Sequence, residues 1–203
     1  LGFVMLSFDR QGAEAPLREC LKRDPKSAEA WCNLGRVLLE RGAFTEGRDA
    51  IKRGHDLGTA RADWPYPSQV WLDDAERLVL AAVHWSGPEL DVATPAEAER
   101  LEVFVLAGLY AGRYRGVADL LIEAEEAFVS ERATPWTLFA GARAAVRAAA
   151  ADSDPANAAE LRNYALEWLR RYVTILRQSL RGRPEGEFDR LAADIVTDAH
   201  LAS

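Results

Sequence analysis

The strongest constraint on the fold of this chain is the spacing of the glycines within residues 30–54, AWCNLGRVLLERGAFTEGRDAIKRG. Apolar residues recur at helical intervals on both sides of Gly42, which predicts two helices joined by a short turn. Gly35, Gly47 and Gly54 fall inside those helices, where a glycine costs roughly 0.5–1 kcal/mol relative to alanine. Such glycines are typical of helices that cross too closely for a side chain, so the spacing predicts a tightly packed antiparallel pair.

Helical spacing continues along the whole chain, and no segment has the period-two alternation of a strand. We therefore predict an all-α fold. The side chains expected to cap its helices are Ser27, Ser68, Thr94 and Thr134. The expected helices cover approximately residues 1–8, 12–23, 28–41, 45–57, 69–83, 95–111, 113–132, 135–151 and 156–181, with a last one from Phe188.

A pair of short helices cannot bury its apolar faces alone, whereas stacked copies of the pair can. With Ala28 as position one of a 34-residue unit, the key residues are Trp31, Leu34, Gly35, Gly42, Phe44, Gly47, Ile51 and Gly54. This pattern resembles the tetratricopeptide repeat (TPR). Counting back 34 residues gives Ala13, Leu17, Cys20 and Pro25, which fit the end of a preceding unit. A weaker unit begins at Ala98, while Leu38 and Thr59 depart from the family pattern.

The resemblance implies a right-handed TPR-like superhelix of antiparallel helix pairs, with irregular helical repeats in the C-terminal half. The expected segments are TPR repeats at 1–61, the first one truncated, a proline-containing connector and helix at 62–93, a degenerate pair at 94–132, and a helical repeat and tail at 133–203. We expect them to pack as one solenoid domain. Because Leu1 does not look like a natural start, we also expect further sequence upstream.

Three further motifs resemble the helical-repeat tails of bacterial serine/threonine protein kinases and related TPR proteins. They are RGHDLG at 53–58, WPYPSQVWLDDAERL at 64–78 and ALEWLRRYV at 165–173. The chain has no glycine-rich loop, H-R-D or D-F-G motif of a kinase domain. The resemblance therefore implies a non-catalytic module, and one hypothesis is a regulatory or substrate-recruiting tail of such a kinase.

Charge argues against two classes of partner. The net charge is −7, with +2 in residues 1–61 and −9 in residues 62–203, so the chain repels nucleic-acid phosphates and anionic lipid.

No apolar run reaches the roughly 18–20 residues that span a bilayer. Two cysteines are too few for a disulfide scaffold, which favours a cytoplasmic location.

No residues form a pattern typical of catalysis, a cofactor site or a metal site. His55, His84 and His200 are widely separated, and we interpret them as packing or surface residues. We expect Cys20 and Cys32 to be small core residues, with a redox pair as the alternative. The acidic pairs, Asp73 with Asp74 and Glu125 with Glu126, are expected on solvated helix faces.

The concave face of the repeat is the best candidate site. The TPR resemblance places six side chains of the helix expected at 28–41 on this face, namely Glu29, Cys32, Asn33, Arg36, Leu39 and Glu40. Of these we predict Glu29, Asn33, Arg36 and Glu40 as a peptide-binding groove, since Asn33 and Arg36 suit a peptide backbone or a carboxylate. Only Asn33 matches the carboxylate clamp of some TPR proteins, and the alternative is that these side chains merely solvate the surface.

The leading functional hypothesis is a non-catalytic scaffold that binds a partner polypeptide in this groove. The acidic cluster Asp119, Glu123, Glu125 and Glu126, opposite a basic N-terminal part, also allows head-to-tail self-association. An independent helical enzyme would require a polar pocket with perturbed pKa values, which nothing in the sequence indicates.

Overall fold

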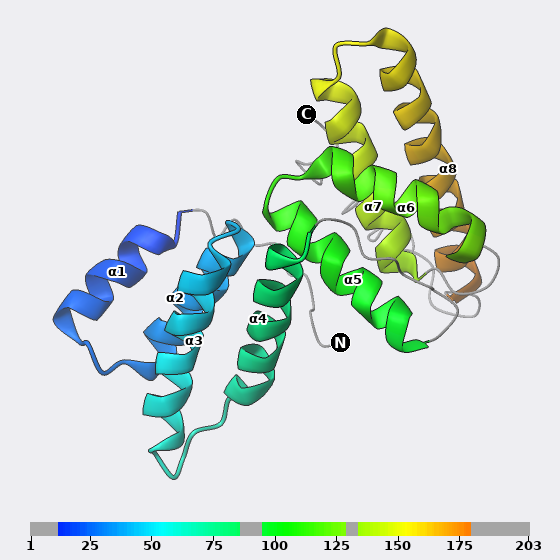
Figure 1. Cartoon of the computed structure of the whole chain (residues 1–203). Coiled ribbons are helices and arrows are strands. Elements are labelled where there is room, and N and C mark those ends of the chain that lie inside the picture. The colour runs from blue at the N-terminus through cyan, green and yellow to red at the C-terminus, as the bar shows by residue number, and fades with distance from the viewer. Residues whose placement is uncertain (1–11, 86–94, 129–133, 180–203) are drawn as a thin grey trace. The chain divides into compact units, whose positions relative to one another are not determined.

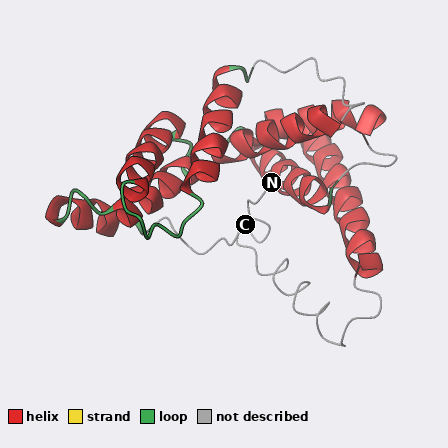
Figure 2. Cartoon of the chain, turned by 90° about the horizontal axis from the view of Figure 1, so that it is seen from below, coloured by secondary structure: helices red, strands yellow, loops and turns green. Residues whose placement is uncertain are grey.

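The computed structural model of the chain describes residues 12–85, 95–128 and 134–179 (Figure 1). These residues form helices joined by turns and contain no strand (Figure 2), so the all-α prediction is confirmed. The helices expected at 1–8 and from Phe188, and the cap at Thr94, lie outside the described residues. The chain divides into two compact units, Leu1–Trp85 and Ser86–Ser203. The expected packing of all segments into one solenoid stays a prediction.

The first unit contains four described helices, α1 (Glu14–Arg23), α2 (Ala28–Glu40), α3 (Phe44–Thr59) and α4 (Ser68–Val83). Helix α1 packs on α2, α2 on α3, and α3 on α4. Ser27 caps α2 as predicted, since its hydroxyl accepts a hydrogen bond from the Ala30 N–H at 3.3 Å. Gly42 makes the turn between α2 and α3 with a φ of 77°, which favours glycine.

Helices α2 and α3 cross at the predicted glycines. A Cβ atom on Gly35 would lie 2.5 Å from Cγ1 of Ile51 and 2.6 Å from the carbonyl oxygen of Gly47. A Cβ atom on Gly54 would lie 2.7 Å from the backbone nitrogen of Cys32. The two distances to backbone atoms are impossible unless a helix moves, so the lack of a side chain at Gly35 and Gly54 sets how closely the two helices approach.

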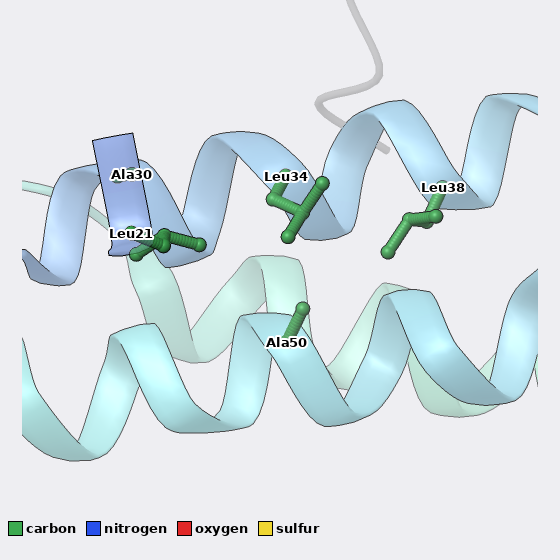
Figure 3. Close-up of a cluster of buried hydrophobic side chains, with 5 residues drawn as sticks. All are labelled: Leu21, Ala30, Leu34, Leu38 and Ala50. Atoms are coloured by element: carbon green, nitrogen blue, oxygen red, sulfur yellow. The ribbon is translucent and has the colours of Figure 1, made fainter. Parts of the chain in front are cut away.

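A cluster of buried side chains fills the space beside this crossing (Figure 3). It consists of Leu21 from α1, Ala30, Leu34 and Leu38 from α2, and Ala50 from α3. Leu17, Trp31 and Ala43 pack at its edge, half-buried. The indole of Trp31 donates a hydrogen bond to the Pro25 carbonyl at 3.0 Å, which ties the α1–α2 turn to the repeat.

Helix α3 is longer than predicted. The expected helix covers about 45–57, whereas the observed one continues through Gly58 to Thr59. The indole of Trp64 occupies the space where a Cβ atom of Gly58 would lie. Gly58 is therefore another site of close packing rather than a helix stop.

The second unit contains α5 (Pro95–Tyr110), α6 (Tyr114–Phe128), α7 (Pro135–Ala151) and α8 (Pro155–Ser179). Gly112, which separates the helices expected at 95–111 and 113–132, makes the α5–α6 turn with a φ of 69°. Helix α7 packs against all three others, which accounts for its small residues: a Cβ atom on Gly141 would lie 2.9 Å from side-chain atoms of both Leu121 and Trp168.

The start of α7 is fixed by a polar network. Thr134 caps the helix as predicted by accepting from the Thr137 N–H at 3.2 Å. The Thr134 hydroxyl also donates to Glu102 of α5 at 2.8 Å. This places a carboxylate beside the N-terminus of α7, where the helix dipole favours negative charge.

The helix crossing yields a stability prediction. Replacing Gly35 by alanine forces α2 and α3 apart and should lower the free energy of unfolding by about 1–3 kcal/mol, the usual cost of overpacking. The control is Gly12→Ala, because a Cβ atom there meets nothing within 4 Å. Urea unfolding followed by circular dichroism measures both. Equal stability of the two variants would contradict the close crossing.

Candidate functional site

The four predicted groove residues lie along one face of α2. Glu29, Asn33, Arg36 and Glu40 follow one another at helical intervals of four, three and four residues. Asn33 is exposed and the other three are half-buried. The structure corrects the groove prediction at two positions: Cys32 is 1% exposed and Leu39 3%, because they pack against Gly54 and Gly47 of α3.

The N-terminal end of this face is held by an ion pair. Arg61, just after α3, donates a hydrogen bond to the Glu29 carboxylate at 2.8 Å and a longer one to Asp63 at 3.4 Å. Hydrogen bonding to its own backbone, and then to Arg61, holds the pKa of Glu29 below its usual value. Glu29 is thus an ionised carboxylate whose charge is already partnered.

The other end of the face meets an aromatic side chain of α4. The guanidinium carbon of Arg36 lies 5.3 Å from the ring centroid of Trp71, within cation–π range. The Trp71 ring lies 6.1 Å from that of Tyr66, and the Tyr66 ring lies 4.9 Å from that of Trp64 in an edge-on contact. We call Trp64, Tyr66 and Trp71 the aromatic ladder.

The aromatic ladder connects Arg36 to Glu29 through a continuous series of contacts. Its far end reaches Arg61, whose guanidinium carbon lies 5.6 Å from the centroid of Trp64. Arg61 binds Glu29, so the contacts run from Glu29 through Arg61 and the ladder to Arg36. Asn33 lies between Glu29 and Arg36 on the same helix face, and is therefore flanked by the first and last residues of this series.

A buried hydroxyl anchors the ladder. Ser68, 1% exposed, accepts a hydrogen bond from the Trp64 indole at 2.9 Å, and its hydroxyl lies 2.8 Å from Nδ1 of His55. The prediction that Ser68 caps α4 is wrong: Pro67 occupies that position without a side-chain hydrogen bond. The hydroxyl is instead engaged by side chains of α3 and of the connector.

Helix α4 repeats the burial pattern of α2 at an interval of 40 residues. Ser68, Leu72, Ala75 and Leu78 are buried, and their counterparts 40 positions earlier, Ala28, Cys32, Gly35 and Leu38, are buried too. Trp71 then corresponds to Trp31. The correspondence is hidden in the sequence because the connector with Pro65 and Pro67 lengthens the 34-residue period. The repeated tryptophan is the signal that could have revealed it.

The remaining candidate residues are scattered. Cys20 and Cys32 are free thiols, and the prediction that both are core residues is wrong for Cys20, which is exposed. His84 and Asp73 are exposed, Asp74 is half-buried, and Asp119 pairs with Arg115 at 2.8 Å. His200 and the side chains of Glu125 and Glu126 lie outside the described residues.

The described residues contain neither a metal-binding cluster nor a helix suited to crossing a membrane. Across 12–85, 95–128 and 134–179, no group of three or more histidine, cysteine, aspartate or glutamate side chains is arranged to hold a metal ion. No described helix combines the length and apolar character that crossing a bilayer requires.

The first unit contains a closely crossed helix pair preceded by a third helix. A comparison with protein families finds a match to the same segment. Residues 17–49 match the tetratricopeptide repeat. The matched TPR segment begins in α1, contains all of α2 and ends within α3, so it includes the whole candidate face. It covers a minor part of the chain. No curated protein and no solved structure gives a significant match, and the comparisons lend no support to the resemblance to kinase tails.

The anchor of the ladder can be tested by removing one oxygen atom. Ser68→Ala leaves the Trp64 indole N–H without its acceptor, and should cost about 1–2 kcal/mol of unfolding free energy. The matched control is Val70→Ala on the same helix, at an exposed position where changes usually stay within about 0.5 kcal/mol. A Ser68→Ala chain as stable as this control would show that the hydroxyl does not fix the connector.

The two thiols should react very differently. Burial raises the pKa of Cys32 to about 11, so at pH 8 almost none of it is the reactive thiolate. A disulfide reagent such as DTNB should therefore modify one thiol quickly, and Cys20→Ala should remove that fast phase. Two thiols modified at the same rate in the folded chain would contradict the burial of Cys32 beneath Gly54.

Proposed function

We propose that this protein is a non-catalytic interaction module, which holds a partner polypeptide on the α2 face bounded by the aromatic ladder. The observation that supports it most directly is the state of Asn33. Its amide is exposed, and it has no hydrogen-bond partner among the described residues, whereas Glu29 beside it is paired with Arg61.

The chemistry of the face suits a peptide backbone. An asparagine amide offers two N–H donors and a carbonyl acceptor, which can pair with the C=O and N–H groups of an extended segment. Arg36 adds a charge-assisted donor, held in place by its stacking on Trp71. The rings of the ladder supply apolar contact area, so one site combines backbone recognition with side-chain contact.

The TPR match supports the same proposal, because TPR repeats are in general protein-interaction modules and the matched segment contains this face. The lack of a catalytic constellation in the sequence is consistent with a non-catalytic role. The alternative of a regulatory kinase tail rests on sequence resemblance alone, and no structural observation favours it.

A charge reversal at the site tests the proposal. Peptides are selected on the full chain from a phage-displayed library of random sequences and then measured against Arg36→Glu. We expect at least about tenfold weaker binding, the scale seen when a hot-spot arginine is removed. Arg162→Glu, an identical charge change at an exposed position of α8, is the control. Equal binding by a folded Arg36→Glu chain would exclude this face as the site.

A further inference from the structure

We propose that the partner segment recognised at this face is proline-rich and binds in the polyproline II conformation against the aromatic ladder. The inference rests on the proposed function and specifies the class of its ligand. It follows from three features of the site, namely ring geometry, hydrogen-bonding groups and rigidity.

The rings form a fixed apolar platform beside α2. Tyr66 is 47% exposed and Trp71 is half-buried, with their centroids 6.1 Å apart and their planes inclined by 36°. Adjacent tilted aromatic rings leave flat surfaces on which pyrrolidine rings pack. Proline-rich segments are recognised in this way by aromatic-lined grooves.

Two side chains of the aromatic ladder offer hydrogen-bond donors. The Trp71 indole can only donate, and neither it nor the Tyr66 hydroxyl has a hydrogen-bond partner within the described residues. Two of the nearby acceptors are already used, Glu29 by Arg61 and the Ser68 hydroxyl oxygen by Trp64, which leaves the Asn33 carbonyl. A proline-rich segment offers the complementary set, because its carbonyls are unpaired and its prolines have no N–H.

Rigidity favours the same ligand. Trp64 is fixed by Ser68 and by its packing on Gly58, and Trp71 lies beneath Arg36, so few side chains need ordering on binding. A polyproline II segment is already extended and loses little conformational entropy. Nucleic-acid bases also stack on aromatic rings, but the net charge of −7 opposes binding of a phosphate backbone.

Fluorescence anisotropy of a labelled decaproline peptide on the full chain tests the inference. We expect binding at least about tenfold tighter than that of a labelled glycine–serine decapeptide, which has similar length but no preformed conformation. Equal binding of the two peptides, or no binding of decaproline, would overturn the proposal.

Variants of Tyr66 and Trp71 separate the contribution of the aromatic rings to binding from that of their hydrogen-bond donors. Tyr66→Ala should weaken decaproline binding about tenfold or more. Tyr66→Phe and Trp71→Phe keep an aromatic ring but remove a donor, so each should weaken it by about fivefold. Leu166→Ala, at an exposed position of α8, should leave binding unchanged, and circular dichroism verifies that every variant is folded. Wild-type affinity in all three ladder variants would contradict the assigned platform.

The selected library peptides distinguish this inference from the proposed function. Selected peptides that lose affinity for Arg36→Glu, contain proline runs and bind more weakly to Tyr66→Ala support both the proposed function and the proline-rich ligand. Peptides that depend on Arg36 but lack proline and ignore Tyr66→Ala overturn the inference and leave the function in place. If no selected peptide depends on Arg36, both fail.

Discussion

The close crossing of α2 and α3 is the constraint on which the first unit depends. Gly35, Gly47 and Gly54 allow backbone atoms of one helix to approach the other at distances that any side chain would block. That contact buries Cys32 and Leu39, and Glu29, Asn33, Arg36 and Glu40 lie on the neighbouring, partly exposed face of α2. The same packing that stabilises the pair therefore determines which side chains a partner can reach.

The connector between α3 and α4 turns that helix face into a bounded site. Trp64 packs on Gly58, the one further glycine of α3 that has no space for a Cβ atom, and donates to a buried hydroxyl at the start of α4. With Trp64 fixed, Tyr66 and Trp71 complete the contacts from Arg61 to Arg36. Under the proposed function, the residues that stabilise the connector are also the residues that contact the partner.

The sequence predicted the helices well because their signals are local. Gly42, Gly112, Ser27 and Thr134 act through their own turns or caps, and each behaves as expected. The errors lie where different elements meet: Gly58 of α3 is covered by Trp64 of the connector, and Ser68 is engaged by His55. Cys20 is exposed although its repeat position suggested burial. The groove face on α2 followed from the repeat pattern, whereas the ladder did not, since the connector breaks the 34-residue period that the pattern requires.

The central claim, that a partner polypeptide is held on the α2 face beside Trp71, is tested most directly by the tryptophan indole signals in a ¹H–¹⁵N NMR spectrum. A peptide captured through Arg36 is titrated into the labelled full chain. We predict that the Trp71 signal shifts progressively, while the signals of Trp31, bonded to the Pro25 carbonyl, and of Trp168, buried in the second unit, stay in place. Shifts at Trp168 with an unmoved Trp71 signal would contradict the account.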